Sequence, residues 1–205
     1  MSGVVPKVGL PLRQAVLYKD RVTRMTDQKI TLHGVFMEVM QLGVLLSGAS
    51  GVGKSELALE LLNRGHRLIA DDAPEFVRLA PASLQGECPE MLRDFLEVRG
   101  LGVINIRAMF GGNAIAPQAE LRLILHLEAM GGERLAAVDR LRPSRDSVII
   151  LDQEIPRITI PVAPGRNLAI LAETAVRGHL LSLDGYDAAA DFSRRQGQFL
   201  SRSEA

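Results

Sequence analysis

Three features that often decide a protein's class are missing from this sequence. Its single cysteine, Cys88, cannot form a disulfide within the chain, which is compatible with a reducing cytosol. The first residues, MSGVVPKVGLPLRQ, lack the apolar segment of a secretory signal peptide. The longest uncharged run, residues 39–53, is too short and too polar to cross a bilayer. These absences predict a cytoplasmic protein without a membrane segment.

A net charge is missing as well, because 24 Lys and Arg residues balance 24 Asp and Glu residues. No global positive field therefore draws the chain to nucleic acid or to an anionic membrane, and neither is an expected partner. Any recognition of phosphate must be local. The 205 residues, 47% hydrophobic and 23% charged, suit a globular protein with one sizeable core.

What the sequence contains is a series of strand-like runs with few helices between them. Residues 1–30 show no clear period and suggest a leader or the remnant of a preceding module, so the main domain is expected over 31–205. Strands are expected in two runs of 33–48 turned at 41–43, and at 67–70, 102–110, 120–128, 147–151 and 157–162. Helices are expected at 54–64 with Gly65 as the C′ residue, and at 89–97, 167–183 and 187–202; residues 73–89 are expected to form a loop region. This order predicts an α/β fold with a mixed β-sheet and flanking helices.

The stretch GASGVGKS, residues 48–55, fits the phosphate-binding pattern G-x-x-x-x-G-K-[ST]. An apolar strand is expected before it and an amphipathic helix after it, as the pattern requires. Backbone N–H groups would converge on phosphate oxygens, Lys54 would reach the β- and γ-phosphates, and the Ser55 hydroxyl would bind Mg²⁺. The alternative is a glycine-rich turn that only caps a helix. The expected phosphate-binding residues are Gly48, Ala49, Ser50, Gly51, Val52, Gly53, Lys54 and Ser55.

Two adjacent aspartates, Asp71 and Asp72, follow the short strand at 67–70. Open α/β sheets place their ligands at the carboxyl ends of strands, so this pair is a candidate for the same site. One interpretation is a turn, because Asp-Asp-Ala-Pro suits turn geometry. A second is a carboxylate that holds Mg²⁺, and a third is a general base that accepts a proton from a hydroxyl acceptor. The residue pattern leaves all three open.

Several stretches together resemble the catalytic domain of the HPr kinase/phosphorylase family. They are His33-Gly34, residues 48–72, LEVRGLGVIN at 96–105, Asp139-Arg140-Leu141 and IPRITIPVAPGRNLA at 155–169. The resemblance runs from about residue 31 to the C-terminus. It implies an enzyme that phosphorylates a serine of the phosphocarrier protein HPr with ATP or pyrophosphate. It also implies the reverse reaction, in which inorganic phosphate attacks phosphoserine to give pyrophosphate.

The resemblance also implies roles for individual residues. Four positions match the family's catalytic residues, with Asp72 as the acid/base: His33, Lys54, Asp72 and Arg140. Two match its ligands for Mg²⁺, or for Mn²⁺ in its place: Ser55 and Glu97. Residues 96–105 match a segment that serves both directions, and 161–166 match one important for dephosphorylation. The implied fold is a P-loop core like that of phosphoenolpyruvate carboxykinase, and the implied assembly is a homo-hexamer.

Each of these roles has a plainer alternative. Without the resemblance, Glu97 and Arg99 would be expected to form a surface salt bridge, and Arg140 would be a solvated loop residue. His33 would be an ordinary histidine at a strand end, and the other three histidines, His66, His126 and His179, are expected to be structural. The alternative functions are a carboxykinase-like small-molecule kinase on the same core and a nucleotide-binding regulator without activity.

One position departs from the family pattern. Ala163 stands in P-V-A-P-G-R where the family commonly has an arginine, which removes a candidate contact to phosphate. The departure predicts less efficient phosphorolysis and leaves the kinase direction intact.

Overall fold

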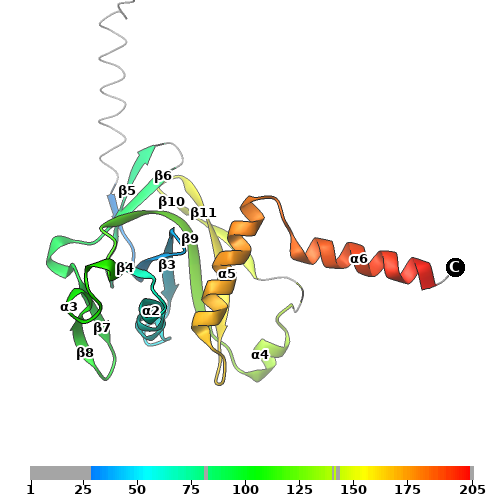
Figure 1. The fold of residues 1–205 in the computed structure, drawn as a ribbon, viewed down its shortest axis with the longest axis horizontal. Helices are drawn as coiled ribbons and strands as arrows, with labels where there is room; N and C mark the ends of the chain where they lie inside the picture. The colour runs from blue at the N-terminus through cyan, green and yellow to red at the C-terminus, as the bar shows by residue number, and fades with distance from the viewer. Residues whose placement is uncertain (1–28, 81–82, 140, 142–143, 204–205) are drawn as a thin grey trace, which may run out of the picture.

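The computed structural model describes residues 29–80, 83–139, 141 and 144–203. In this part of the chain, the main sheet is curled and has nine strands (Figure 1). Seven of them run in the order β1-β5-β6-β9-β3-β2-β4, and the other two, β10 and β11, attach through the pairing of β11 with β9. Most of the predicted leader, residues 1–28, lies outside the described residues, and β1 (Lys29–Thr31) pairs with β5. None of the described helices combines the length and the apolar character needed to cross a membrane.

The strand–loop–helix unit predicted for residues 33–65 is confirmed. β2 (Val35–Val39) and β3 (Leu42–Gly48) form an antiparallel hairpin, and its turn lies at Met40 and Gln41, slightly before the predicted position. Both turn residues have positive φ, 51° and 65°, as a two-residue turn between twisted strands requires. After the loop, α2 (Lys54–Asn63) ends at Arg64, and Gly65 follows with φ 88°.

The sheet is mixed, as the sequence predicts. β9 (Gln118–Ala129) pairs parallel with β3 on one side and parallel with β11 (Gln153–Val162) on the other. β10 (Arg145–Ile150) and β4 (Arg67–Ala70) add antiparallel pairs with β11 and β2. Because β2 is antiparallel to both β3 and β4, the carboxyl ends of β3 and β4 lie at the same edge as the start of β2.

Helices cover one face of this sheet. α2 and α5 (Leu168–Leu183) pack there over a core that includes Leu57, Leu61 and Val176 (Figure 1). Asn167 caps α5 by accepting a hydrogen bond from the Ile170 N–H at 3.0 Å. A second core lies on the other face, where the rings of Phe36 and Phe76 meet edge to face with centroids 5.0 Å apart.

The loop predicted for residues 73–89 is wrong, because this segment forms the hairpin of β5 (Glu75–Ala80) and β6 (Ser83–Glu87). Its apolar residues alternate over only a few positions, so the local pattern is weak. The strands form because Phe76 and Leu84 are buried in the second core. Pairing of β6 with β9 supplies further backbone partners for residues 85–87.

The helix predicted for residues 89–97 is also wrong. A single 3₁₀ turn, η1 (Glu90–Leu92), ends at Arg93, whose ψ of 136° is extended, and β7 (Phe95–Val98) follows. Leu96 and Val98 are buried while their neighbours face outward, which is strand alternation rather than helical spacing.

The strand predicted for residues 102–110 is half correct. β8 (Gly102–Asn105) pairs with β7 in a separate two-stranded sheet, and α3 (Ile106–Phe110) follows at once. The change happens at Asn105, whose side chain accepts a hydrogen bond from the Ala108 N–H at 2.8 Å and so caps the helix.

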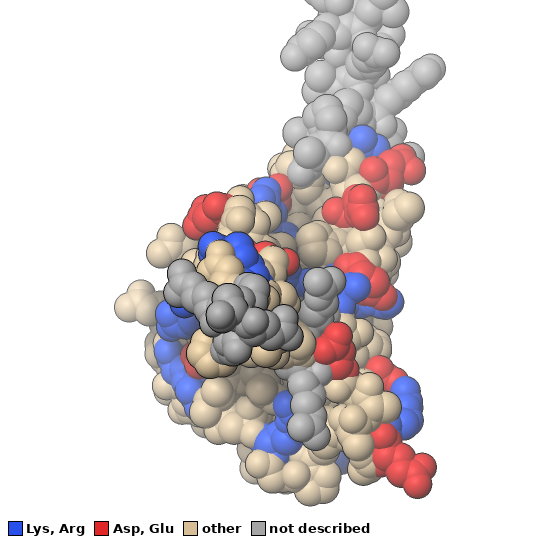
Figure 2. Space-filling model, turned by 90° about the vertical axis from the view of Figure 1, so that its right-hand side faces the viewer, with Lys and Arg blue, Asp and Glu red and all other residues tan. Residues whose placement is uncertain are grey.

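The remaining elements are short or peripheral. η2 (Gly112–Ala114) and α4 (Gly132–Ala136) lie in connections, whereas α6 (Ala188–Ser203) matches the last predicted helix and projects away from the sheet (Figure 1). On the face seen in Figure 2, Lys and Arg side chains are interspersed with Asp and Glu. That mixture fits the zero net charge, because ion pairs such as Arg157–Asp146 neutralise local charges.

His179 is a buried ionisable group in this fold. It lies on the same stripe of α5 as Ala172 and Val176 and is 6% exposed. Burial, together with the nearby charges of Arg145 and Arg122, lowers the pKa of its imidazole below the ordinary value of 6.5. The neutral ring is therefore the form that the folded protein favours.

We expect the free energy of unfolding to fall as the pH drops below about 6.5. In that range the unfolded chain protonates His179 at its ordinary pKa, whereas the folded protein resists the proton, so acid favours unfolding. The variant His179→Gln should show a smaller loss between pH 7 and pH 5 in urea denaturation. Equal losses in the variant and the wild type would contradict this assignment.

Candidate active site

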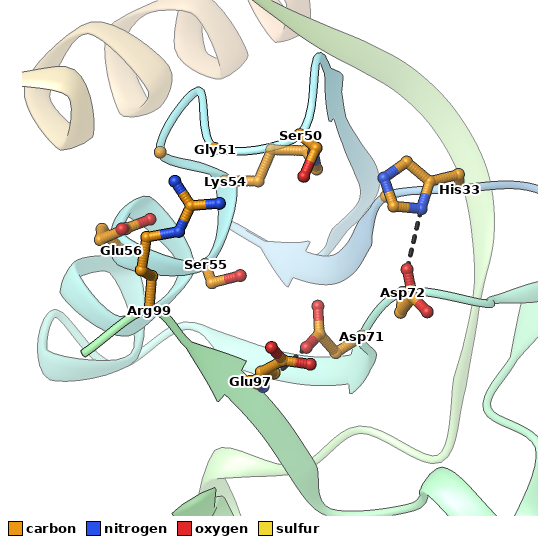
Figure 3. Close-up of a pocket in the computed structure, with 12 residues that line it drawn as sticks. His33, Ser50, Gly51, Lys54, Ser55, Glu56, Asp71, Asp72, Glu97 and Arg99 are labelled. Atoms are coloured by element: carbon orange, nitrogen blue, oxygen red, sulfur yellow. Dashed lines mark hydrogen bonds and ion pairs between the residues drawn. The ribbon is translucent and has the colours of Figure 1, made fainter. Parts of the chain in front are cut away.

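A cavity of about 180 Å³ opens at the sheet edge where β3 and β4 end and β2 begins (Figure 3). Four segments supply its walls: the connection before β2, the glycine-rich loop with the start of α2, the turn after β4, and the end of β7. The lining residues are His33, Gly34, Ser50, Gly51, Gly53, Lys54, Ser55, Glu56, Asp71, Asp72, Glu97 and Arg99. The cavity thus brings together most of the site residues that the sequence predicted.

The glycine-rich loop leaves the sheet at Gly48. This residue has φ 139°, and a Cβ built on it would lie 2.4 Å from the carbonyl oxygen of Leu127 on β9. A side chain therefore does not fit between the two strands. The loop then turns through Gly51 and Gly53, both with positive φ, into the first turn of α2.

Lys54 is the buried charge of this loop, only 8% exposed. Its ammonium Nζ donates hydrogen bonds to the carbonyl oxygens of Gly48 and Ala49, both at 3.1 Å. These bonds hold the Lys54 ammonium against the first two residues of the glycine-rich loop. Gly53, the N-cap, provides no side-chain acceptor for the first-turn N–H groups, so this helix end suits an anion.

Asp72 and His33 face each other across the cavity mouth. Nδ1 of His33 lies 2.8 Å from Oδ1 of Asp72, and both side chains are more than half exposed. Asp72 has φ 66°, an unusual backbone conformation for a non-glycine residue. The backbone also links the two segments, since the Gly34 N–H donates to the Asp72 carbonyl at 3.3 Å.

Asp71 points away from its neighbour, toward β7 (Figure 3). Its Oδ2 accepts a hydrogen bond from the backbone N–H of Glu97 at 2.8 Å. Burial raises the pKa of the Asp71 carboxyl above its ordinary value, and hydrogen bonds from the backbone N–H groups of Glu97 and Asp72 oppose that rise. The adjacent aspartates therefore have different partners and different environments.

Glu97 and Arg99 reach the cavity because they alternate with the buried Leu96 and Val98 along β7 and its end. The Arg99 guanidinium lies beside the glycine-rich loop, and a Cβ built on Gly51 would be 2.9 Å from its Nη1. Among the described residues, Glu97 and Arg99 form no salt bridge with each other, contrary to the plainer sequence interpretation. Two-residue alternation was the signal that could have placed both side chains on one face.

The oxygen atoms around the cavity suit a hard cation. Ser55 offers a hydroxyl group, and Asp71, Asp72 and Glu97 offer carboxylates. No group of three or more His, Cys, Asp or Glu residues in the described part of the chain is arranged as a complete metal cage. Mg²⁺ is commonly held by only one or two protein carboxylates together with waters and substrate phosphates. The donor set fits that mode of binding.

Two further parts of the family pattern concern Arg140 and the segment 161–166. Arg140 falls outside the described residues, so its position is not part of this geometry. Arg166, the last residue of the 161–166 segment, lines an adjacent groove together with Gly53 and Glu56 at the start of α2. The end of this segment thus lies near the end of the glycine-rich loop.

Comparisons with known proteins agree on one family. Residues 24–196 match the model of the HPr Serine kinase C-terminal domain. An HPr kinase/phosphorylase of Xanthomonas campestris pv. campestris is 50% identical over 200 residues, which are 97% of this chain and 63% of that protein. One from Xanthomonas euvesicatoria pv. vesicatoria is 53% identical over 182 residues, 88% of this chain and 58% of that protein.

A solved structure matches as well. The Hpr(Ser) kinase/phosphatase from Coxiella burnetii superposes with a TM-score of 0.71 at 36% identity and covers 80% of this chain and 98% of that one. The fold and cavity define a mixed α/β protein whose glycine-rich loop faces a group of carboxylates. The chain belongs to the HPr Serine kinase C-terminal domain family. It spans 63% of the length of the first Xanthomonas relative.

The close approach of Gly48 to the Leu127 carbonyl can be tested by substitution. We expect Gly48→Ala to lower the free energy of unfolding by about 1–3 kcal/mol, because the methyl group meets the Leu127 carbonyl and φ is unfavourable. Urea denaturation measures the change. Gly132→Ala is the control, since nothing lies within 4 Å of the added Cβ and the residue is helical without a positive φ. Equal stability of the two variants would contradict the close contact.

Proposed function

We propose that the chain is an ATP-dependent protein-serine kinase and phosphorylase that acts on the phosphocarrier protein HPr. The observation that carries the proposal is the single cavity shared by Lys54, Ser55, Asp72 and Glu97. Support comes from relatives at 50% and 53% identity that are named HPr kinase/phosphorylase. The same relatives give no support to a carboxykinase-like small-molecule kinase.

In this proposal, residues 48–55 form a P-loop that holds the phosphates of ATP or pyrophosphate. Its backbone N–H groups and the N-terminus of α2 face the phosphates, and Lys54 exchanges its carbonyl partners for phosphate oxygens. Ser55 and Glu97 would hold Mg²⁺, or Mn²⁺ in its place. When bound, the cation supplies positive charge that neutralises the phosphate oxygens.

Asp72 is the proposed acid/base. In the forward direction its carboxylate accepts the proton of the substrate serine while the serine oxygen takes the γ-phosphoryl group of ATP and ADP leaves. In reverse, the protonated carboxyl returns that proton to the serine oxygen as inorganic phosphate takes the phosphoryl group to form pyrophosphate. His33, 2.8 Å away, orients the carboxylate, and the exposure of both groups leaves room for a protein substrate. Arg140 is proposed to neutralise charge on the transferring group.

The wider setting follows from the same proposal. The catalytic domain comprises residues 31–205, with 1–30 as a leader or the remnant of another module, and its core is of the phosphoenolpyruvate-carboxykinase type. The enzyme assembles as a homo-hexamer and acts in the cytoplasm, a location with which the single cysteine is compatible.

Incubation with HPr, ATP and Mg²⁺ tests the proposal directly, and phosphoserine on HPr is the expected product. We expect Asp72→Asn to lower both directions about 10²–10⁴-fold while ATP affinity changes little, because the amide cannot take the proton. Phosphoserine formation and equilibrium ATP binding give the two readouts. Asp146→Asn, in an exposed ion pair with Arg157, is the control. Normal transfer by Asp72→Asn would contradict the acid/base role.

Ala163 provides a separate test of the reverse reaction. We expect Ala163→Arg to raise the phosphorolysis rate about tenfold, the order of effect of one charge-assisted hydrogen bond, with a smaller change in the kinase rate. Pyrophosphate release from phosphoserine-HPr and inorganic phosphate is the measurement. Ala163→Gln adds a long side chain without the charge, and an equal gain in that variant would rule out a charge effect.

A further inference from the structure

The proposed reaction uses Asp72 and leaves its neighbour Asp71 without a role. Both belong to the turn after β4, yet only Asp72 reaches His33 at the open cavity mouth. Asp71 is half-buried, and its carboxylate is directed at a peptide group of another segment. A partly buried carboxylate in such a position needs its hydrogen bond, because a buried polar group without a partner is costly.

The segment that Asp71 contacts has few hydrogen-bonded links to the rest of the protein. β7 pairs only with β8, in a two-stranded sheet outside the nine-stranded sheet. In the part of the chain that the structure describes, the bond from the Glu97 N–H to Asp71 is the one hydrogen bond that joins residues 95–105 to the nine-stranded sheet and its connecting turns. The other anchors are apolar, chiefly the buried side chains of Leu96 and Val98.

Apolar contacts are not directional, whereas a hydrogen bond to a peptide N–H fixes one backbone position. That position is Glu97 itself, and its side chain extends from the fixed peptide toward the cavity (Figure 3). Arg99, two residues on, shares this face and lies beside Gly51 of the glycine-rich loop. The Asp71 bond therefore helps to fix the positions of the Glu97 and Arg99 side chains relative to the glycine-rich loop.

We propose that Asp71 is a positioning residue: by holding the peptide N–H of Glu97, it places the Glu97 carboxylate for the cation and Arg99 against the phosphate loop. The inference rests on the proposed function, since the cation role of Glu97 belongs to it. Asp71 acts here as a hydrogen-bond acceptor at a backbone group. A neutral acceptor of the same shape should therefore replace it.

The variants Asp71→Asn and Asp71→Ala separate this role from a direct role of the charge. Asparagine keeps an acceptor oxygen at the same distance from the backbone, whereas alanine removes it. Hydrogen exchange of the Glu97 amide, followed by NMR, reports the bond itself. Mn²⁺ affinity in the presence of a non-hydrolysable ATP analogue, followed by the electron paramagnetic resonance of free Mn²⁺, reports its consequence.

We expect Asp71→Ala to speed exchange of the Glu97 amide and to weaken Mn²⁺ binding, each about tenfold, and Asp71→Asn to stay within about threefold of the wild type in both. The double variant Asp71→Ala/Glu97→Gln should bind Mn²⁺ no more weakly than Glu97→Gln alone, because Asp71 acts through that carboxylate. If Asp71→Ala does not fold, Asp71→Ser replaces it, since its hydroxyl is too short to reach the Glu97 N–H.

Two results would overturn the inference. One is an unchanged exchange rate of the Glu97 amide in Asp71→Ala. The other is Mn²⁺ binding by Asp71→Asn that is as weak as that of Asp71→Ala while the amide stays protected, which would assign Asp71 a direct contact to the cation. Asp146→Ala is the control for loss of a carboxylate outside the cavity. Neither readout uses HPr, so a failed HPr phosphorylation assay leaves this test independent.

Discussion

The parallel pairing of β3 with β9 is the constraint on which the site depends. Its register places Gly48 opposite Leu127 at such close range that the chain must leave the sheet there as a loop. Since β4 runs in the same direction as β3, the turn with Asp71 and Asp72 emerges at the same edge. The connection containing His33 enters there too, because β2 runs the opposite way. One strand arrangement thus brings together the glycine-rich loop, the aspartates and the histidine.

The turn after β4 gives the side chains of Asp71 and Asp72 different partners. With Asp72 at φ 66°, the chain reverses its side-chain directions within one residue, so Asp72 meets His33 while Asp71 meets the peptide of Glu97. One carboxylate stays largely exposed to solvent. The other is partly desolvated and joins the small β7–β8 sheet to the main one.

Local patterns were sufficient where local energetics decide the structure. The glycine spacing, the apolar run before it and the amphipathic helix after it predicted β3, the loop and α2, because each feature concerns neighbouring residues. The same logic failed for 73–97, where Phe76 and Leu84 become strand residues only by entering a core made with distant Phe36. Pro89 suggested a helix start, yet alternating burial of Leu96 and Val98 against α2 favoured a strand.

For the site, the order of residues alone predicted that Lys54 and Ser55 face phosphate and nominated Asp72, His33 and Glu97 through their family pattern. Residue order does not state that Asp71 and Asp72 point to different partners, or that Arg99 rests against Gly51 instead of pairing with Glu97. Those contacts join segments 26 or more residues apart, as with Asp71 and Glu97. They exist only once the strand order brings the segments to one edge, because hydrogen-bond partners across a fold are set by distance and direction in space.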